Sequence, residues 1–117
     1  MRKRHKYSAV ATIVDGIRFA SKKEARRYGE LMLLEQAGKI ERLQLQPKYR
    51  LGTDKNPVLI RSDRYPNGRR ASYIADFKYF DSTGEYVVED VKGMDTPVSK
   101  LKRAVVEAQY GIRIILI

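Results

Sequence analysis

Cysteine is absent from the 117-residue sequence, which excludes disulfides, zinc–thiolate sites and thiol nucleophiles together and fits a reducing, cytoplasmic location. An apolar run long enough to span a membrane is also missing, so we expect no membrane association. The basic segment at residues 1–6 is not followed by the apolar stretch of a signal peptide. Histidine occurs only as His5 in that segment, where a tail residue is a better interpretation than a general base.

Acidic residues are in deficit, with 14 Asp and Glu against 24 Lys and Arg and a net charge of +10. In so small a chain this excess indicates a polyanionic partner, most simply nucleic acid contacted through its phosphates. A membrane surface is less favoured, because no strongly basic amphipathic helix is evident. The hydrophobic content of 43% is that of a globular protein. We expect a basic flexible arm at residues 1–6 and a single domain at residues 7–117.

A predicted β-hairpin at residues 73–93 carries charged residues inside apolar arms. Asp90 and Lys92 are two residues apart in the second arm, so their side chains share a face of the strand. A three-residue turn sets Asp76 of the first arm opposite Asp90, with the two Cβ atoms about 5 Å apart. A four-residue turn sets it opposite Glu89 instead, because a one-residue slip exchanges the faces. Either register gathers two carboxylates and a lysine at one end of the hairpin.

The elements before this hairpin follow from capping and periodicity. Ser21 and Glu24 match a capping box and predict a helix over residues 22–37. Alternating apolar residues predict a strand over residues 41–51, in which Pro47 indicates an edge or a bulge. The rest of this half is a predicted hairpin of residues 7–14 and 17–19 and a loop of residues 52–71 with a short strand-like segment at 58–60.

After the hairpin, Thr96 and Pro97 predict the start of a helix that ends at Gln109. Residues 112–117 are nearly all apolar and predict a strand buried on both faces, as in a parallel sheet. Strand, helix and strand then form a right-handed crossover unit. The apolar helix residues that we expect to be buried are Leu101, Ala104, Val105 and Ala108.

Two carboxylates and a lysine suit the chemistry of a metal-dependent phosphodiesterase. Paired carboxylates hold one or two Mg²⁺ ions, which lower the pKa of an attacking water and neutralise charge on the phosphate. A neighbouring lysine orients that water or stabilises the developing oxyanion. Asp76, Asp90 and Lys92 supply this set, and the basic surface suits a nucleic-acid substrate.

Asp76, followed fourteen residues later by the Asp90-Val-Lys92 tripeptide, resembles the signature of the PD-(D/E)XK nuclease superfamily. The predicted α-β-β-β-α-β order is similar to that superfamily's core. Residues 16–25, with a glutamate in the first helix, resemble the branch that holds phage endonuclease I, a Holliday-junction resolvase, and the end-cleaving subunit of certain transposons. Over about residues 12–117, the scale of a single domain, the chain most closely resembles a small family of phage and prophage proteins of that superfamily, described only as endonucleases.

The resemblance implies an α/β protein with a restriction-endonuclease-like αβββαβ core and an N-terminal β-hairpin. It implies an Mg²⁺-dependent endonuclease, with Mn²⁺ as a substitute, that hydrolyses DNA phosphodiesters. Glu24, Asp76 and Asp90 would bind the metal, and Lys92 would complete the catalytic quartet. Two departures are Ala75, where the pattern has proline, and Asp90, where glutamate is commoner; neither removes a ligand.

The same resemblance implies a phage or prophage protein acting in the cytoplasm of a bacterial host. The expected substrate is branched or Holliday-junction DNA cut by a homodimer. A chain of 117 residues leaves little beyond the core for reading base sequence, and paired cuts need two sites.

These assignments have alternatives. The capping box alone accounts for Glu24, and a solvated strand face accounts for Asp90 and Lys92. For the whole chain, the alternatives are a non-catalytic nucleic-acid-binding module and a transposase-like subunit that cuts only within a larger assembly. Candidate phosphate contacts are the arginines of residues 61–70 with Lys100, Lys102 and Arg103, and candidate base-stacking residues are Tyr49, Tyr65 and Tyr73.

Overall fold

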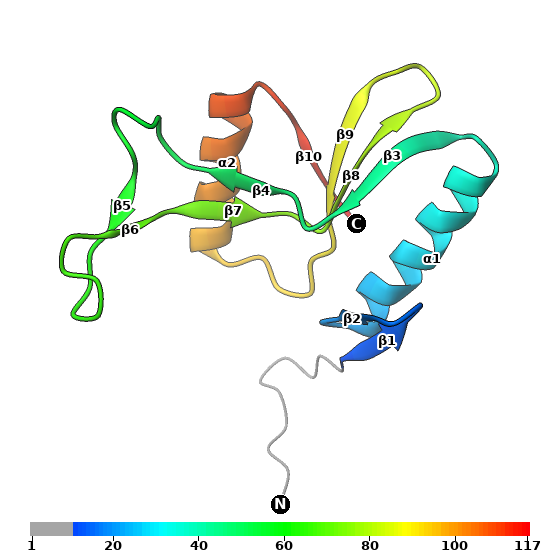
Figure 1. Cartoon of the computed structure of the whole chain (residues 1–117), viewed down its shortest axis with the longest axis horizontal. Coiled ribbons are helices and arrows are strands. Elements are labelled where there is room, and N and C mark those ends of the chain that lie inside the picture. Colours follow the sequence, from blue (N-terminus) through cyan, green and yellow to red (C-terminus); the bar gives the residue numbers. More distant parts are fainter. Residues whose placement is uncertain (1–10) are drawn as a thin grey trace, which may run out of the picture.

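The computed structural model describes residues 11–117 and has a mixed α/β fold, as the sequence predicts (Figure 1). The expected basic arm, with His5, and residues 7–10 of the first predicted strand lie outside the described residues. No helix among residues 11–117 is long and apolar enough to cross a membrane. The elements are β1 (Thr12–Val14), β2 (Ile17–Phe19), α1 (Lys22–Gln36), β3 (Ile40–Leu45), β4 (Lys48–Arg50), β5 (Leu59–Ile60), β6 (Arg69–Arg70), β7 (Ser72–Ile74), β8 (Phe77–Asp81), β9 (Tyr86–Asp90), α2 (Pro97–Tyr110) and β10 (Ile114–Leu116).

A four-stranded sheet with the order β10-β9-β8-β3 forms the centre of the molecule. β8 pairs antiparallel with both β3 and β9, while β10 runs parallel to β9 after the α2 crossover. The helices lie on either side of this sheet in Figure 1. Each helix therefore builds its own core: Tyr28 and Leu31 of α1 pack with Phe77, while Val106 of α2 packs with Val88.

Helix α1 forms where its capping signals predict. The Ser21 hydroxyl accepts a hydrogen bond from the Glu24 amide at 3.1 Å, which satisfies one of the free amide groups of the first turn. At the other end the backbone of Gly38 adopts a left-handed conformation (φ 73°), which ends the helix. These signals are local, so they hold Glu24 at the helix N-terminus independently of the rest of the fold.

Two strands leave the central sheet at one corner and form an arm. The chain bends between β3 and β4, where Gln46 has a positive φ of 51° before Pro47, and again between β7 and β8 at Asp76. The two bends are joined by hydrogen bonds from the Gln46 amide to the Asp76 carbonyl (2.9 Å) and from the Ala75 amide to the Pro47 carbonyl (3.1 Å). At Pro47, where the sequence indicates an edge or a bulge, the chain thus passes from the central sheet into the sheet formed by β4 and β7.

Beyond that corner, β4 pairs with β7, and β5 pairs with β6 in a short ribbon at the far end of the arm (Figure 1). The first arm of the predicted hairpin is therefore divided: residues 72–74 pair with β4, and only residues 77–81 pair with β9. The predicted loop of residues 52–71 contains the β5–β6 ribbon, so it is more ordered than its turn-forming residues indicate.

Two predictions of burial are wrong. On α2, Leu101 is 67% exposed and Val105 is 37% exposed, and both Ala104 and Ala108 are also exposed, because Val106 provides the buried contact on the opposite side of the helix. The C-terminal strand β10 is an edge strand, so its side chains are not covered on both faces. Ile114 of β10 is buried, while Ile115 and Leu116 are each more than 40% exposed.

Candidate functional site

The β8–β9 register places Asp76 opposite Asp90. The Asp81 amide donates to the Glu85 carbonyl at 2.9 Å across a three-residue turn, and Phe77 pairs with Glu89 further along the ladder. The next step brings Asp76 beside Asp90, and the Asp76 amide donates to the Glu89 carbonyl at 3.1 Å. The three-residue register is therefore confirmed, and the alternative that sets Asp76 opposite Glu89 is excluded.

The carboxyl groups of Asp76 and Asp90 lie within hydrogen-bonding distance of each other. Burial is the largest influence on Asp76 and, together with this contact, raises the pKa of its carboxyl to about 8. The Val91 amide opposes this shift by donating to Asp76 Oδ2 at 2.6 Å. Two acidic groups so close need a shared proton or a bound cation between them.

Glu24 is the third carboxylate of this cluster. It comes from the first turn of α1, is buried, and its carboxyl group lies within hydrogen-bonding distance of that of Asp76. Burial raises the pKa of Glu24, a backbone hydrogen bond with Ala20 opposes this, and the charge of Asp90 adds to the increase. Glu24 can therefore both belong to the capping box and approach Asp76, because the first turn of α1 lies close to Asp76.

Asp90 is held by two further side chains. Lys92 Nζ lies 3.1 Å from Asp90 Oδ2, which confirms that these two residues share a face of the strand. The Tyr73 hydroxyl donates a hydrogen bond to the same Oδ2 atom, and Lys92 Nζ also lies 5.7 Å from the centre of the Tyr73 ring. Burial is the main cause of a raised Tyr73 pKa, so this tyrosine remains a proton donor. No sequence pattern predicts this contact, because β7 and β9 belong to different sheets.

Glu89 belongs to the opposite face of β9. Arg27 of α1 donates to both of its carboxylate oxygens at 2.7 Å, and the Tyr79 hydroxyl donates to Oε2 as well. Glu89 is thus paired with a helix arginine and a strand tyrosine. With all of these donors on the α1 side, Glu89 does not join the cluster of Asp76 and Asp90.

The donor set of the cluster fits Mg²⁺. Among residues 11–117, no three His, Cys, Asp or Glu side chains are already arranged to hold one metal ion. Mg²⁺, however, is usually bound through one or two carboxylates, with water and substrate phosphate oxygens completing its octahedron. Asp76 and Asp90 supply such a pair, and the mutual approach of these two acids is relieved when a cation replaces the shared proton.

A basic groove runs along the arm and is lined by residues of β4, β5, β6 and β7 together with Lys102 of α2. Tyr49 and Tyr73 of these strands are buried toward the α2 core, so stacking on bases is not open to either ring. Their neighbours along the two strands line the groove, whose volume is about 520 Å³. Its lining consists of Lys48, Arg50, Ile60, Arg69, Arg70, Ala71, Ser72, Ile74 and Lys102.

Not all the predicted phosphate contacts are available to a ligand. Arg70 donates to the carbonyls of Leu51 and Gly52, and the guanidinium of Arg103 binds both oxygens of Asp95, so both arginines have structural partners. At the far end of the arm the exposed Tyr65 ring has two guanidinium groups, each 5.7 Å from its centre. These cations belong to Arg64 and Arg69.

Comparison with known proteins identifies a family. Residues 4–115 match the family model described as "Protein of unknown function (DUF1064)". No curated protein and no solved structure shows significant similarity to the chain.

Proposed function

The chain belongs to the DUF1064 family, and we propose that it is a metal-dependent endonuclease that hydrolyses DNA phosphodiesters. One observation carries the proposal: Asp76 and Asp90 face each other at the end of the β8–β9 ladder, with the Lys92 ammonium 3.1 Å from Asp90. Opposed carboxylates, of which Asp90 is buried and Asp76 half-buried, are costly for a fold to maintain beside a lysine without a ligand. A non-catalytic module has no need of them.

The topology supports the proposal independently. Around the central sheet the elements follow the order α1, β3, β8, β9, α2, β10, which is the α-β-β-β-α-β order of a restriction-endonuclease-like core. The proposed site lies where β8 and α1 begin and where β9 ends. Glu24 of α1 reaches Asp76 there, although the two residues are far apart in the sequence.

Each residue of the site has a role in this proposal. Asp76 and Asp90 hold Mg²⁺, or Mn²⁺ in its place, and Glu24 contacts the ion directly or through water. The bound ion supplies an activated water and offsets the charge that develops on the phosphate. Lys92 orients the attacking water through its ammonium, and Tyr73 fixes the position of Asp90 by its hydrogen bond.

The basic groove provides the contact with the substrate. Lys48, Arg50 and Arg69 line it and are exposed, and Lys102 adds a fourth cation from α2. Cations along a groove neutralise successive phosphates without reading base sequence. Branched or junction DNA is the proposed substrate, since the arm offers contacts to the backbone beyond the site.

Incubation with supercoiled DNA and with a four-way junction tests the activity. We expect nicking or junction cleavage with Mg²⁺ or Mn²⁺ and none with a chelator. Asp90→Ala and Lys92→Ala should each lower the cleavage rate by at least about 100-fold, a loss typical for a group that stabilises the transition state. Binding of the junction should persist in Lys92→Ala when Ca²⁺ replaces Mg²⁺.

The control variant is Glu85→Ala, an exposed carboxylate at the turn of the same hairpin. It removes a negative charge without touching the site and should cleave as the wild type does. Binding without cleavage under every metal would overturn the proposal in favour of a binding module. Cleavage that needs added partner proteins would indicate a subunit of a larger assembly.

A further inference from the structure

Helix α2 presents a continuous apolar stripe to solvent. Val98 is 68% exposed and Leu101 is 67% exposed, although both are large hydrophobic residues. Together with other apolar residues of α2 they recur every three or four positions, so they form one face of the helix. This face is three turns long and has no charged side chain. The stripe consists of Pro97, Val98, Leu101, Ala104, Val105 and Ala108.

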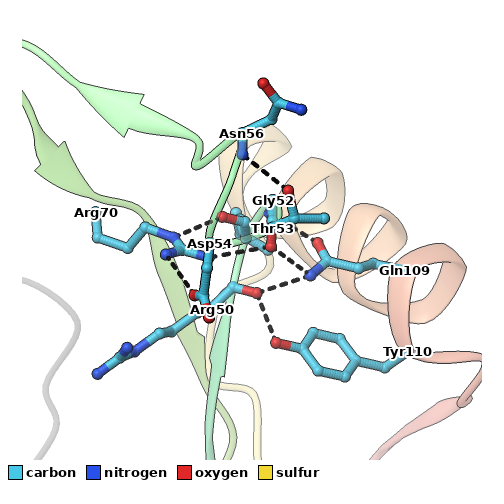
Figure 2. Close-up of polar contacts among 9 residues, drawn as sticks. Arg50, Gly52, Thr53, Asp54, Asn56, Arg70, Gln109 and Tyr110 are labelled. Atoms are coloured by element: carbon cyan, nitrogen blue, oxygen red, sulfur yellow. Dashed lines mark hydrogen bonds and ion pairs between the residues drawn. The ribbon is translucent and has the colours of Figure 1, made fainter.

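The helix is fixed in this orientation. At its C-terminal end the Gln109 amide donates to the carbonyls of Arg50 (3.1 Å) and Gly52 (2.9 Å) and accepts from the Gly52 amide, and the Tyr110 hydroxyl donates to the Arg50 carbonyl at 2.6 Å (Figure 2). From the middle of the helix, Arg103 binds Asp95, which lies just before the N-cap residue Thr96. Rotation of the stripe into the core would break all of these bonds.

A stripe of this size on a fixed helix calls for a partner surface. Isolated apolar residues are common on protein surfaces, but a contiguous apolar face is typical of an interface. Nucleic acid is a poor occupant because the stripe carries no cation to neutralise phosphates. The cationic groove is lined mainly by residues of β4, β6 and β7, and α2 contributes only Lys102 to it, which is not part of the stripe.

The chemistry of the stripe and its flank favours a second copy of the same helix. Ala104 and Ala108 lack bulk, which lets two helices approach closely. Lys100 and Glu107 lie on one flank of the stripe, seven residues apart. The Glu107 carboxylate accepts a hydrogen bond from the Ile114 amide through Oε2 (2.9 Å), which leaves Oε1 for a partner. An antiparallel pair related by a two-fold axis between residues 103 and 104 brings Lys100 of each copy to Glu107 of the other. This gives charge complementarity together with apolar contact.

We propose that the α2 stripe is the interface of a homodimer in which the two α2 helices pack antiparallel. The inference goes beyond the nuclease proposal, and it rests only on the exposed apolar face and its flanking charges. Each protomer then contributes one complete set of Glu24, Asp76, Asp90 and Lys92, so the dimer carries two separate sites.

The absence of cysteine permits a sharp test by disulfide cross-linking of the full chain. Ala104 lies half a residue from the proposed axis, so a pair of Ala104→Cys protomers should form a disulfide in high yield under mild oxidation. Ala108 lies on the same stripe, but its two copies are separated by about 14 Å along the helices, too far for a disulfide. Ala108→Cys should therefore remain largely uncross-linked.

Sedimentation equilibrium gives the second measurement. The wild type should be a dimer at micromolar concentration, and Leu101→Glu should raise the dissociation constant at least about 100-fold, because symmetry removes two buried leucines at once. The matched control is Leu33→Glu on α1, because Leu33 is also 67% exposed. It should leave the dimer intact.

Three outcomes would overturn the inference. These are a wild-type monomer at tens of micromolar, a dimer that Leu101→Glu does not weaken, and cross-linking of Ala108→Cys as efficient as that of Ala104→Cys. The last would indicate a parallel or irregular contact. None of these measurements requires cleavage of DNA, so the interface and the proposed activity succeed or fail separately.

Discussion

Arg27 of α1 binds both carboxylate oxygens of Glu89 at 2.7 Å, while the next residue along β9, Asp90, faces the opposite side of the sheet. The Glu89 side chain is 2% exposed and that of Arg27 is 20% exposed, so the pair is largely removed from solvent. Adjacent acidic residues thus have different partners: Glu89 joins α1 to the sheet, and Asp90 joins the cluster with Asp76.

The first prediction concerns the stability of this ion pair. Glu89→Leu removes the buried anion of Arg27 and leaves it only the exposed Glu30 carboxylate, 3.6 Å away. The free energy of unfolding should fall by about 3 kcal/mol, at the low end for a buried pair because Arg27 keeps some solvent contact. The double variant Arg27→Leu with Glu89→Leu should recover a large part of that loss, since both charges are then gone. Urea unfolding measures both values. Equal losses in the single and double variants would contradict a direct pairing.

A second prediction follows from the raised pKa of Asp76, which is about 8 against an ordinary value of 3.8. The folded protein holds this proton more tightly than the unfolded chain does. Its contribution to stability is therefore complete below about pH 4 and is lost as the pH rises toward 8. In the presence of a chelator, the melting temperature should fall over that range.

Asp76→Asn removes the titrating group, so the melting temperature of this variant should fall much less between pH 4 and pH 8. At pH 8 the variant should melt at a higher temperature than the wild type. Asp63→Asn changes an exposed carboxylate on the arm and serves as the control. It should follow the wild-type profile. A profile that Asp76→Asn leaves unchanged would show that another group causes the pH dependence.

The third prediction concerns metal addition. If a divalent cation takes the place of the proton between Asp76 and Asp90, as we propose, Mg²⁺ should stabilise the protein more at pH 8 than at pH 5. At a concentration 100 times the dissociation constant, the gain is about 2.7 kcal/mol. Differential scanning fluorimetry with and without chelator measures it. Asp76→Asn should abolish the gain, and an equal response at both pH values would argue against displacement of a proton.

Some features of the site are predictable because their signals are local. The three-residue turn with Gly84 in a left-handed conformation (φ 83°) fixes the hairpin register, and the register in turn sets Asp76 opposite Asp90. The capping box likewise fixes the position of Glu24. Each of these signals acts over a few residues, where steric limits and hydrogen bonds decide the conformation.

The errors arise where the outcome depends on distant parts of the chain. The periodicity of α2 identifies which face is apolar, but not which face meets the core. Tyr110 and Gln109 are held by β4 and the turn after it, and this anchoring directs Leu101 outward and Val106 inward. The arm likewise depends on hydrogen bonds between Gln46 and Asp76, thirty residues apart. Sequence patterns along a single element do not contain this information.

The last prediction separates substrate contact from catalysis. Lys48 and Arg50 line the basic groove and are exposed, so replacing both by alanine should weaken binding of a junction in Ca²⁺ without affecting folding. If each contacts one phosphate, the slope of log K against log salt should become shallower by about 1 per residue. Lys39→Ala removes an exposed cation at the end of α1, away from the arm, and should keep the wild-type slope. An equal change in both variants would mean that binding depends on net charge and not on the groove.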